Sequence, residues 1–195
     1  MKQEYIISAY SENHIGLLNR ITIIFTRRKV NIESITASES AIEGISKLTI
    51  VVNDEKEKVV NITKQIEKQV EVLKAFYHTN EEMIFQEIAL YKVPTQALME
   101  SDKIEKMIRQ HNARILEITP EYTVIEKTGH KEETQDLFNR LVEYGVLQFI
   151  RSGRVAITRS PIEKLSEFLK ERDALLERIE SRGKLRTTKK IIQVK

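Results

Sequence analysis

Apolar positions in the first part of the chain change from a strand-like pattern to a helical one. Residues 4–10 are rich in Tyr and Ile, as strands are. A polar stretch follows, and five apolar positions then recur at helical spacing: Leu17, Leu18, Ile21, Ile24 and Phe25. We therefore predict a strand at 4–10, followed by a helix that starts at about 15–17 and ends near 28–29.

Three more strands and one more helix complete this first unit. The Ile, Val and Thr content predicts strands at 31–38, 45–53 and 72–79, and the β-branched density of 45–53 predicts a central place in a sheet. Asp54, with Glu57 three residues later, has capping-box spacing. An amphipathic helix then follows from the apolar positions Val59, Ile62, Ile66 and Val70. The predicted order over 3–79 is β-α-β-β-α-β.

The same order of elements recurs after a polar break at 79–82, which we interpret as a domain linker. Strands are predicted at 86–93, 113–119, 122–128, 146–151 and 155–158, and helices at 96–111 and 131–143. The recurrence lies in element order and not in residue identity. Split β-α-β topology on an antiparallel sheet is the ferredoxin-like arrangement. The predicted fold class is therefore α+β, with two ferredoxin-like domains at 3–79 and 82–159.

Residues 160–195 are predicted to form a helical and basic extension. Ser160 and Pro161 suit a helix start, with Glu163 three residues after the cap, and Gly183 is a predicted stop. An apolar stripe, interrupted by Arg172, comprises Ile162, Leu165, Leu169, Leu176 and Ile179. Three uses remain open: packing on the chain's own second domain, docking on another subunit, or binding an acidic polymer. The stripe favours protein contact.

Charge is unevenly distributed, and this changes the interpretation of a net charge of +3. Residues 182–195 hold six bases and no acids, whereas the other 181 residues carry 26 bases and 29 acids. The basic character therefore belongs to the tail and is poor evidence that the body binds nucleic acid. The chain lacks Cys, which excludes disulfides and thiolate chemistry. Without a signal peptide or a membrane-spanning run, we expect a cytoplasmic protein with no membrane partner.

Catalytic and metal-binding signatures are missing from the sequence. The four His residues have no partner at metal-ligand spacing, and six Gly residues in 195 form no Gly-rich phosphate loop. No nucleophile elbow, zinc-protease motif or dinucleotide fingerprint is present. An enzyme is therefore disfavoured, although a small enzyme built on ferredoxin-like domains remains an alternative.

One segment, Asn13 to Leu18, has the chemistry of a ligand site. Gly16 lets the backbone approach a ligand closely, and the N–H groups of Gly16, Leu17 and Leu18 at the helix start favour an anion. The side-chain amide of Asn13 both donates and accepts. Asn31 begins the next strand, on the far side of the helix. The set would suit the carboxylate, ammonium and apolar side chain of a branched amino acid, but a Gly and an Asn at a helix start are also common capping chemistry.

Residues 11–38 resemble the opening motif of the acetolactate (acetohydroxyacid) synthase small regulatory subunit family. That motif reads E-N-x-x-G-x-L-x-R, followed by F-x-R-R-x-x-N-I-E-S-L. The matching positions are Glu12, Asn13, Gly16, Leu18, Arg20, Phe25, Arg27, Arg28, Asn31, Ile32, Glu33 and Ser34. Further segments agree in order, among them 45–50, 62–73, 86–93, 115–129, Gly145-Val146 and Arg151-Ser152-Gly153. The resemblance covers 3–159.

The resemblance implies an ACT domain at 3–79 that pairs with a second copy, and the family's C-terminal domain at 82–159. It implies a non-catalytic subunit that binds the thiamine-diphosphate-dependent large catalytic subunit, activates it and confers feedback inhibition by valine in branched-chain amino-acid synthesis. Thiamine diphosphate, Mg²⁺ and FAD would belong to the large subunit, so no cofactor is expected in this chain. Nucleic acid is not an expected partner. A free-standing ACT-domain amino-acid sensor or transcriptional co-regulator is the alternative.

The family's valine site lies between two ACT domains, and its residues map onto both ends of the predicted helix. The expected effector-binding residues are Asn13, Ile15, Gly16, Leu17, Leu18, Asn31 and Ile32. Asn31 and Ile32 would come from the facing protomer. Leu17 is bulkier than the Val or Ala found there in the family, and such a side chain would narrow the pocket.

Overall fold

The computed structural model describes residues 1–100, 102–162, 164–172 and 174. By its contacts the chain divides into two units, Met1–Ile157 and Thr158–Lys195. The two sheets of the described residues lie in the first unit, apart from the last residue of the final strand.

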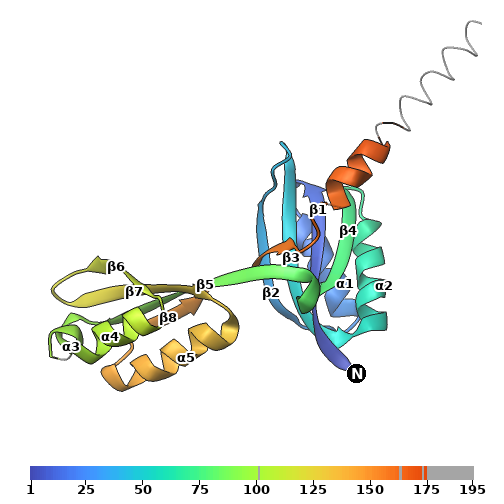
Figure 1. Cartoon of the computed structure of the whole chain (residues 1–195). Coiled ribbons are helices and arrows are strands. Elements are labelled where there is room, and N and C mark those ends of the chain that lie inside the picture. The colour runs from blue at the N-terminus through green and yellow to red at the C-terminus, as the bar shows by residue number, and fades with distance from the viewer. Residues whose placement is uncertain (101, 163, 173, 175–195) are drawn as a thin grey trace, which may run out of the picture. The chain divides into compact units, whose positions relative to one another are not determined.

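The first domain is a four-stranded antiparallel sheet with two helices (Figure 1). Its elements are β1 (Lys2–Glu12), α1 (Leu17–Arg27), β2 (Ile32–Glu39), β3 (Ile45–Glu55), α2 (Lys56–Glu67) and β4 (Val72–Thr79). The strand order is β2-β3-β1-β4, so β3 is central, as the β-branched content of 45–53 predicts. A 3₁₀ turn, η1 (Asn80–Glu82), follows at the predicted linker.

The core of this domain forms because every second residue of β1 and β3 faces the helices. Ile7 and Ile50, which pair across these strands, are fully buried. They pack with Ile21 and Phe25 of α1 and with the apolar stripe of α2 in a single cluster. The opposite face of the same strands carries Ile6 and Val51, which belong to a separate apolar cluster. The sheet is therefore covered on the helix side and packed at one place on the other.

The second domain repeats the strand order of the first. Its elements are β5 (Met83–Pro94), α3 (Thr95–Met99), α4 (Asp102–Gln110), β6 (Arg114–Ile118), β7 (Tyr122–Gly129), α5 (Lys131–Leu141), η2 (Val142–Tyr144), β8 (Gln148–Arg151) and β9 (Val155–Thr158). The order β6-β7-β5-β8 is that of β2-β3-β1-β4 in the first domain. Strand β9 pairs with β5 outside this path. The prediction of two ferredoxin-like α+β domains is confirmed.

Two predicted details of α2 are wrong. Asp54 does not form a capping box with Glu57, because the N-cap of α2 is Glu55 and makes no side-chain cap. The Asp54 carboxylate instead accepts hydrogen bonds from the Glu55 N–H (2.8 Å) and from Lys58. The Glu55 bond in particular lowers the pKa of Asp54, against the effect of burial. Val70 lies beyond the helix and is exposed, so it adds nothing to the apolar face.

The helices of the second domain are shorter than the hydrophobic pattern predicts. The predicted helix at 96–111 is two helices, α3, which ends at Met99, and α4, which begins at Asp102. Asp102, the first residue of α4, is of a type that favours helix ends over helix interiors. The predicted helix at 131–143 ends at Leu141 and continues as η2, which Gly145 ends in a left-handed conformation (φ +80°). Strand β8 consequently begins at Gln148 and not at residue 146.

Part of the predicted C-terminal helix lies within the described residues. The Ser160 hydroxyl accepts a hydrogen bond from the Ile162 N–H (3.2 Å), but residues 161 and 162 form a bend, so the predicted helix start at Pro161 is wrong. Residues 164–172 are helical. Glu163, Leu176, Ile179 and Gly183 lie outside the described residues. Among the described helices, none is long and apolar enough to cross a membrane.

Candidate functional site

The loop from β1 to α1 has the open backbone that its sequence predicts. Gly16 is the N-cap of α1 and adopts a left-handed conformation (φ +85°, ψ −3°), which a residue with a Cβ adopts only under strain. Beyond its chain neighbours, a Cβ built at Gly16 would meet no atom of the described residues within 4 Å, and the side chain of Ile15 is fully exposed. The first turn of α1 contains no acidic residue. A ligand carboxylate could therefore reach this helix end without electrostatic repulsion from the first turn.

Two expectations about Leu17 are wrong. Its N–H is not free for a ligand, because it donates to the His14 carbonyl oxygen (3.3 Å). Its side chain does not narrow a pocket, because it is 5% exposed and belongs to the core beneath the sheet. Leu18, by contrast, is half-exposed on the outer side of α1. Of the two leucines, only Leu18 is placed to contact a ligand through its side chain.

The other predicted residues lie at the far end of α1. Lys29 turns the chain (φ +53°), after which Asn31 is exposed and Ile32 is half-buried at the start of β2. The Asn31 amide donates a long hydrogen bond to Glu33 (3.4 Å). Since α1 has 11 residues, about 16 Å of helix separates this end from Gly16. One chain does not bring the two groups together, so a site that uses both needs a second copy of the chain.

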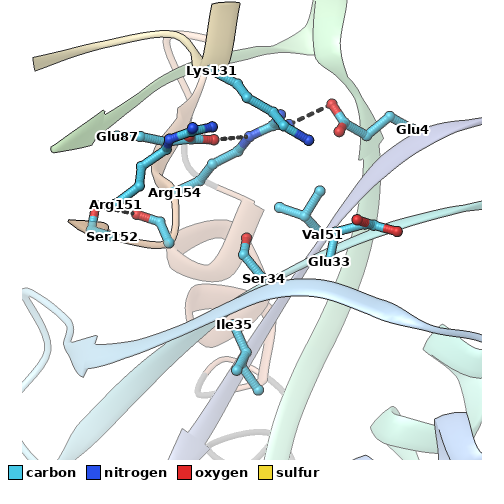
Figure 2. Close-up of a pocket in the computed structure, with 11 residues that line it drawn as sticks. Glu4, Glu33, Ser34, Ile35, Val51, Glu87, Lys131, Arg151, Ser152 and Arg154 are labelled. Atoms are coloured by element: carbon cyan, nitrogen blue, oxygen red, sulfur yellow. Dashed lines mark hydrogen bonds and ion pairs between the residues drawn. The ribbon is translucent and has the colours of Figure 1, made fainter. Parts of the chain in front are cut away.

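A second polar site, which sequence reasoning missed, lies where the 151–154 loop meets the first domain. A cavity of ≈ 360 Å³ is lined there by Glu4, Glu33, Ser34, Ile35, Val51, Glu87, Lys131, Arg151, Ser152, Gly153 and Arg154. Figure 2 shows Arg154 between Glu87 and Glu4 and bonded to both. The similarity of 151–153 to a family segment draws attention to this loop but not to its contacts. Glu4, the ion-pair partner of Arg154, lies 150 positions away in the sequence.

The charges at this second site hold one another in place. Burial raises the pKa of Glu4, but hydrogen bonds from Arg154 and Asn80 outweigh it and leave the pKa below its ordinary value. Glu4 is therefore ionised at neutral pH and pairs with the Arg154 guanidinium. Within the described part of the chain, no group of three or more His, Asp or Glu side chains is arranged to hold a metal ion.

Comparison with known protein families places both domains. Residues 7–74 match the family model of the ACT domain of the AHAS small-subunit type, and residues 86–160 match the model of the small subunit of acetolactate synthase. The tandem ferredoxin-like fold, with an open strand-to-helix turn at Gly16, thus defines a protein of the ACT-domain class. More particularly, the chain belongs to the acetolactate synthase small-subunit family.

Individual relatives agree with this assignment over most of their length. The chain is 36% identical to the acetolactate synthase small subunit of Bacillus subtilis over 162 residues, which cover 83% of this chain and 94% of that protein. It is 31% identical to a probable acetolactate synthase small subunit of Methanothermobacter thermautotrophicus, over 80% of this chain and 92% of that protein. The crystal structure of the small subunit from Thermotoga maritima superposes with a TM-score of 0.74 at 30% identity, covering 82% of this chain and 99% of that one.

Proposed function

We propose that this chain is the regulatory subunit of an acetolactate synthase. It binds the thiamine-diphosphate-dependent catalytic subunit, raises its activity and makes it sensitive to valine. The chain itself catalyses no reaction, and the cofactor-dependent chemistry takes place on the catalytic subunit. The observation that carries the proposal is the 36% identity with the Bacillus subtilis small subunit over 94% of that protein's length.

The geometry of the first domain supports an amino acid as the effector. The left-handed Gly16 leaves the start of α1 open, and the positive end of the helix dipole there favours a carboxylate. Leu18 and Ile32 offer exposed or half-exposed apolar surface for a branched side chain. Because Asn13 and Asn31 lie at opposite ends of α1, we propose that two ACT domains pair and that each shared site takes one end from each protomer.

Valine would act through a free-energy coupling between this site and the catalytic subunit. It stabilises one arrangement of the paired ACT domains, and that arrangement favours a less active holoenzyme. A ligand can shift the equilibrium only by as much as its affinities for the two arrangements differ.

The test is reconstitution with the acetolactate synthase catalytic subunit of the same organism. Acetolactate formation from pyruvate is measured for each protein alone, for the mixture, and for the mixture with valine. We expect no activity from this chain alone, several-fold activation on mixing, co-elution of the two proteins in gel filtration, and inhibition of the mixture by valine.

Failure to co-elute and to activate would refute the regulatory assignment. If the isolated chain nevertheless bound valine, the free-standing sensor would become the better interpretation. Activation without any response to valine would retain the subunit assignment and remove the effector.

A further inference from the structure

Arg154 joins three parts of the chain through one buried guanidinium group. Its Nε donates to Glu87 of β5 (3.0 Å), and its Nη1 donates to Glu4 of β1 (2.7 Å) and to Asn80 of η1 (3.2 Å). Arg154 is 5% exposed. One side chain of the β8–β9 loop thus contacts the first domain, the turn between the domains and the second domain.

The chemistry of this contact is specific to arginine. The planar guanidinium presents donors in a fixed fork, which a lysine ammonium cannot reproduce on two separate carboxylates. The ring of Phe85 lies 4.2 Å from the guanidinium carbon and fills its free face. Glu87 is also buried, so removal of Arg154 would leave a carboxylate without its main partner. The arrangement therefore has a strong preference for one geometry.

The residue before Arg154 lies directly against β2. A Cβ built on Gly153 would sit 2.3 Å from Thr36 Oγ1 and 3.2 Å from the Ile35 carbonyl oxygen, so only glycine allows this approach. Ser34 and Ile35 line the same cavity as Arg151 and Arg154, as Figure 2 shows. An apolar cluster of Ile6, Val51, Met83 and Ala156 adds packing between β1, β3, β5 and β9.

Strand β2 also carries half of the proposed effector site. It begins at Ile32, next to Asn31, and reaches Ile35 three residues later, about 10 Å along a strand. Ile32, Ser34 and Ile35 all pair with β3, with a register shift between Ile32 and Ser34. A shift at the effector end of β2 would therefore be felt at its contact with Gly153.

We propose that the 151–154 loop couples the effector site to the second domain, with Arg154 as the positioning residue. This inference rests on the proposed function, because it names the route by which effector occupancy reaches the part of the chain beyond η1. Occupancy at the start of β2 moves the strand against Gly153. The Arg154 network transmits that movement to Glu87 in β5, since its fixed geometry resists independent movement of β1 and β5.

The measured quantity is the ratio of the valine Kd of the free full-length chain to its Kd in the complex with the catalytic subunit. Thermodynamic linkage makes this ratio equal to the effect of valine on the affinity of the two subunits. In the unmodified protein we expect it to differ from 1 by a factor of about 5 to 150, the usual range of allosteric coupling. In R154M we expect a ratio close to 1, with the valine Kd of the free chain changed less than about two-fold.

Three further variants separate coupling from general damage. R109M removes an exposed Arg whose ion pair lies within its own helix, and it should keep the full ratio. G153A forces the loop off β2 without removing a charge, and it should lower the ratio as R154M does, so the test does not depend on how well R154M folds. G153A/T36A removes the Thr36 hydroxyl that the new Cβ would meet, so this double variant should restore part of the ratio. A full ratio in both R154M and G153A would overturn the proposal.

Hydrogen exchange of the 31–39 segment keeps the test independent of valine. In the free chain, R154M should change exchange in this segment and R109M should not. If valine or the catalytic subunit fails to bind the unmodified chain, the proposed function fails while this comparison still decides the coupling. Unchanged exchange of 31–39 in R154M would overturn the inference even if valine regulates the holoenzyme.

Discussion

Gly16 holds the left-handed backbone that joins β1 to α1, and beyond its chain neighbours no described residue lies within 4 Å of a Cβ built there. Substitution there adds a side chain to the proposed ligand position at a modest backbone cost. Asn and Asp are the residues that tolerate this conformation best. The pair G16N and G16D therefore isolates charge, because the two side chains have nearly the same shape.

We expect G16D to weaken valine binding at least ten-fold relative to G16N, since its carboxylate would occupy the place of the ligand carboxylate and repel it. Activation of the catalytic subunit should be the same in both variants. Isothermal titration of valine and the activation assay measure the two properties separately. Equal valine affinity in G16D and G16N would mean that the effector site lies elsewhere.

For single residues, the sequence predicts which positions have special chemistry better than it predicts which way their side chains point. Spacing marks Gly16 and Asn13 as special, but it does not reveal that the side chain of Leu17 turns into the core while that of Leu18 faces out. Nor does it reveal that the Leu17 N–H is taken by His14. These facts depend on where the helix axis lies relative to the sheet, which local pattern does not encode.

At the scale of elements, a titratable side chain lies just beyond the end of α4 and faces α5. His111 follows α4, is largely buried, and lies 3.7 Å from Asp136 of α5. Burial lowers the pKa of His111, and the positive charges of Arg140 on α5 and Lys127 on β7 lower it further, against the opposing effect of Asp136. Lys127 also donates to the His111 carbonyl oxygen (2.8 Å). The folded domain therefore prefers a neutral imidazole.

The preference for a neutral His111 determines how the stability of the fold changes with pH. The unfolded chain, with a His pKa near 6.5, binds a proton that the folded chain resists, so stability is lost as pH falls below that value. We expect the melting temperature to fall between pH 7.5 and 5.5 by more in the unmodified chain than in H111Q. H14Q, at an exposed His, is the matched control and should behave like the unmodified chain. Parallel curves for H111Q and the unmodified chain would contradict this assignment.

Element order was predictable because alternation and helical spacing are local signals. All nine strands and four helices predicted at 4–158 correspond to observed elements, one helix being divided in two. Boundaries were less predictable where local chemistry competes. Asp54 has the spacing of a capping box, yet its carboxylate bonds to Glu55 and Lys58 and the cap moves on by one residue. Strand β5 begins at Met83, earlier than predicted, because its first residues pack with Ile6 and Val51 of the other domain.

In the whole molecule, the same topology appears twice, and the contacts that join the two copies could not be predicted. The Arg154–Glu4 pair spans 150 positions, and neither residue stands out in its local sequence. The assembly of the effector site could not be predicted from spacing either, because its two halves lie at opposite ends of α1. Only the family resemblance, and not spacing, suggests that a second protomer brings them together.

The C-terminal extension lies beyond the part of the chain that the family models match. That match ends at residue 160, and 162 aligned residues cover 94% of the Bacillus subtilis small subunit. We therefore expect a chain truncated after Ser160 to retain the ACT-paired dimer and valine binding. The apolar stripe, of which Leu165 and Leu169 lie on the helix at 164–172, favours a protein contact for the extension. Truncation should then lower either the melting temperature or the affinity for the catalytic subunit.

The comparison uses truncated and full-length chains in light scattering, valine titration, thermal melting and pull-down with the catalytic subunit, at low and high salt. A stripe-mediated contact should persist at high salt, whereas binding of the basic residues to an acidic polymer should weaken steeply. Loss of nucleic-acid binding, with melting and pull-down unchanged, would contradict the protein-contact prediction and favour the sensor alternative. A monomeric truncated chain would instead place the extension in the dimer interface.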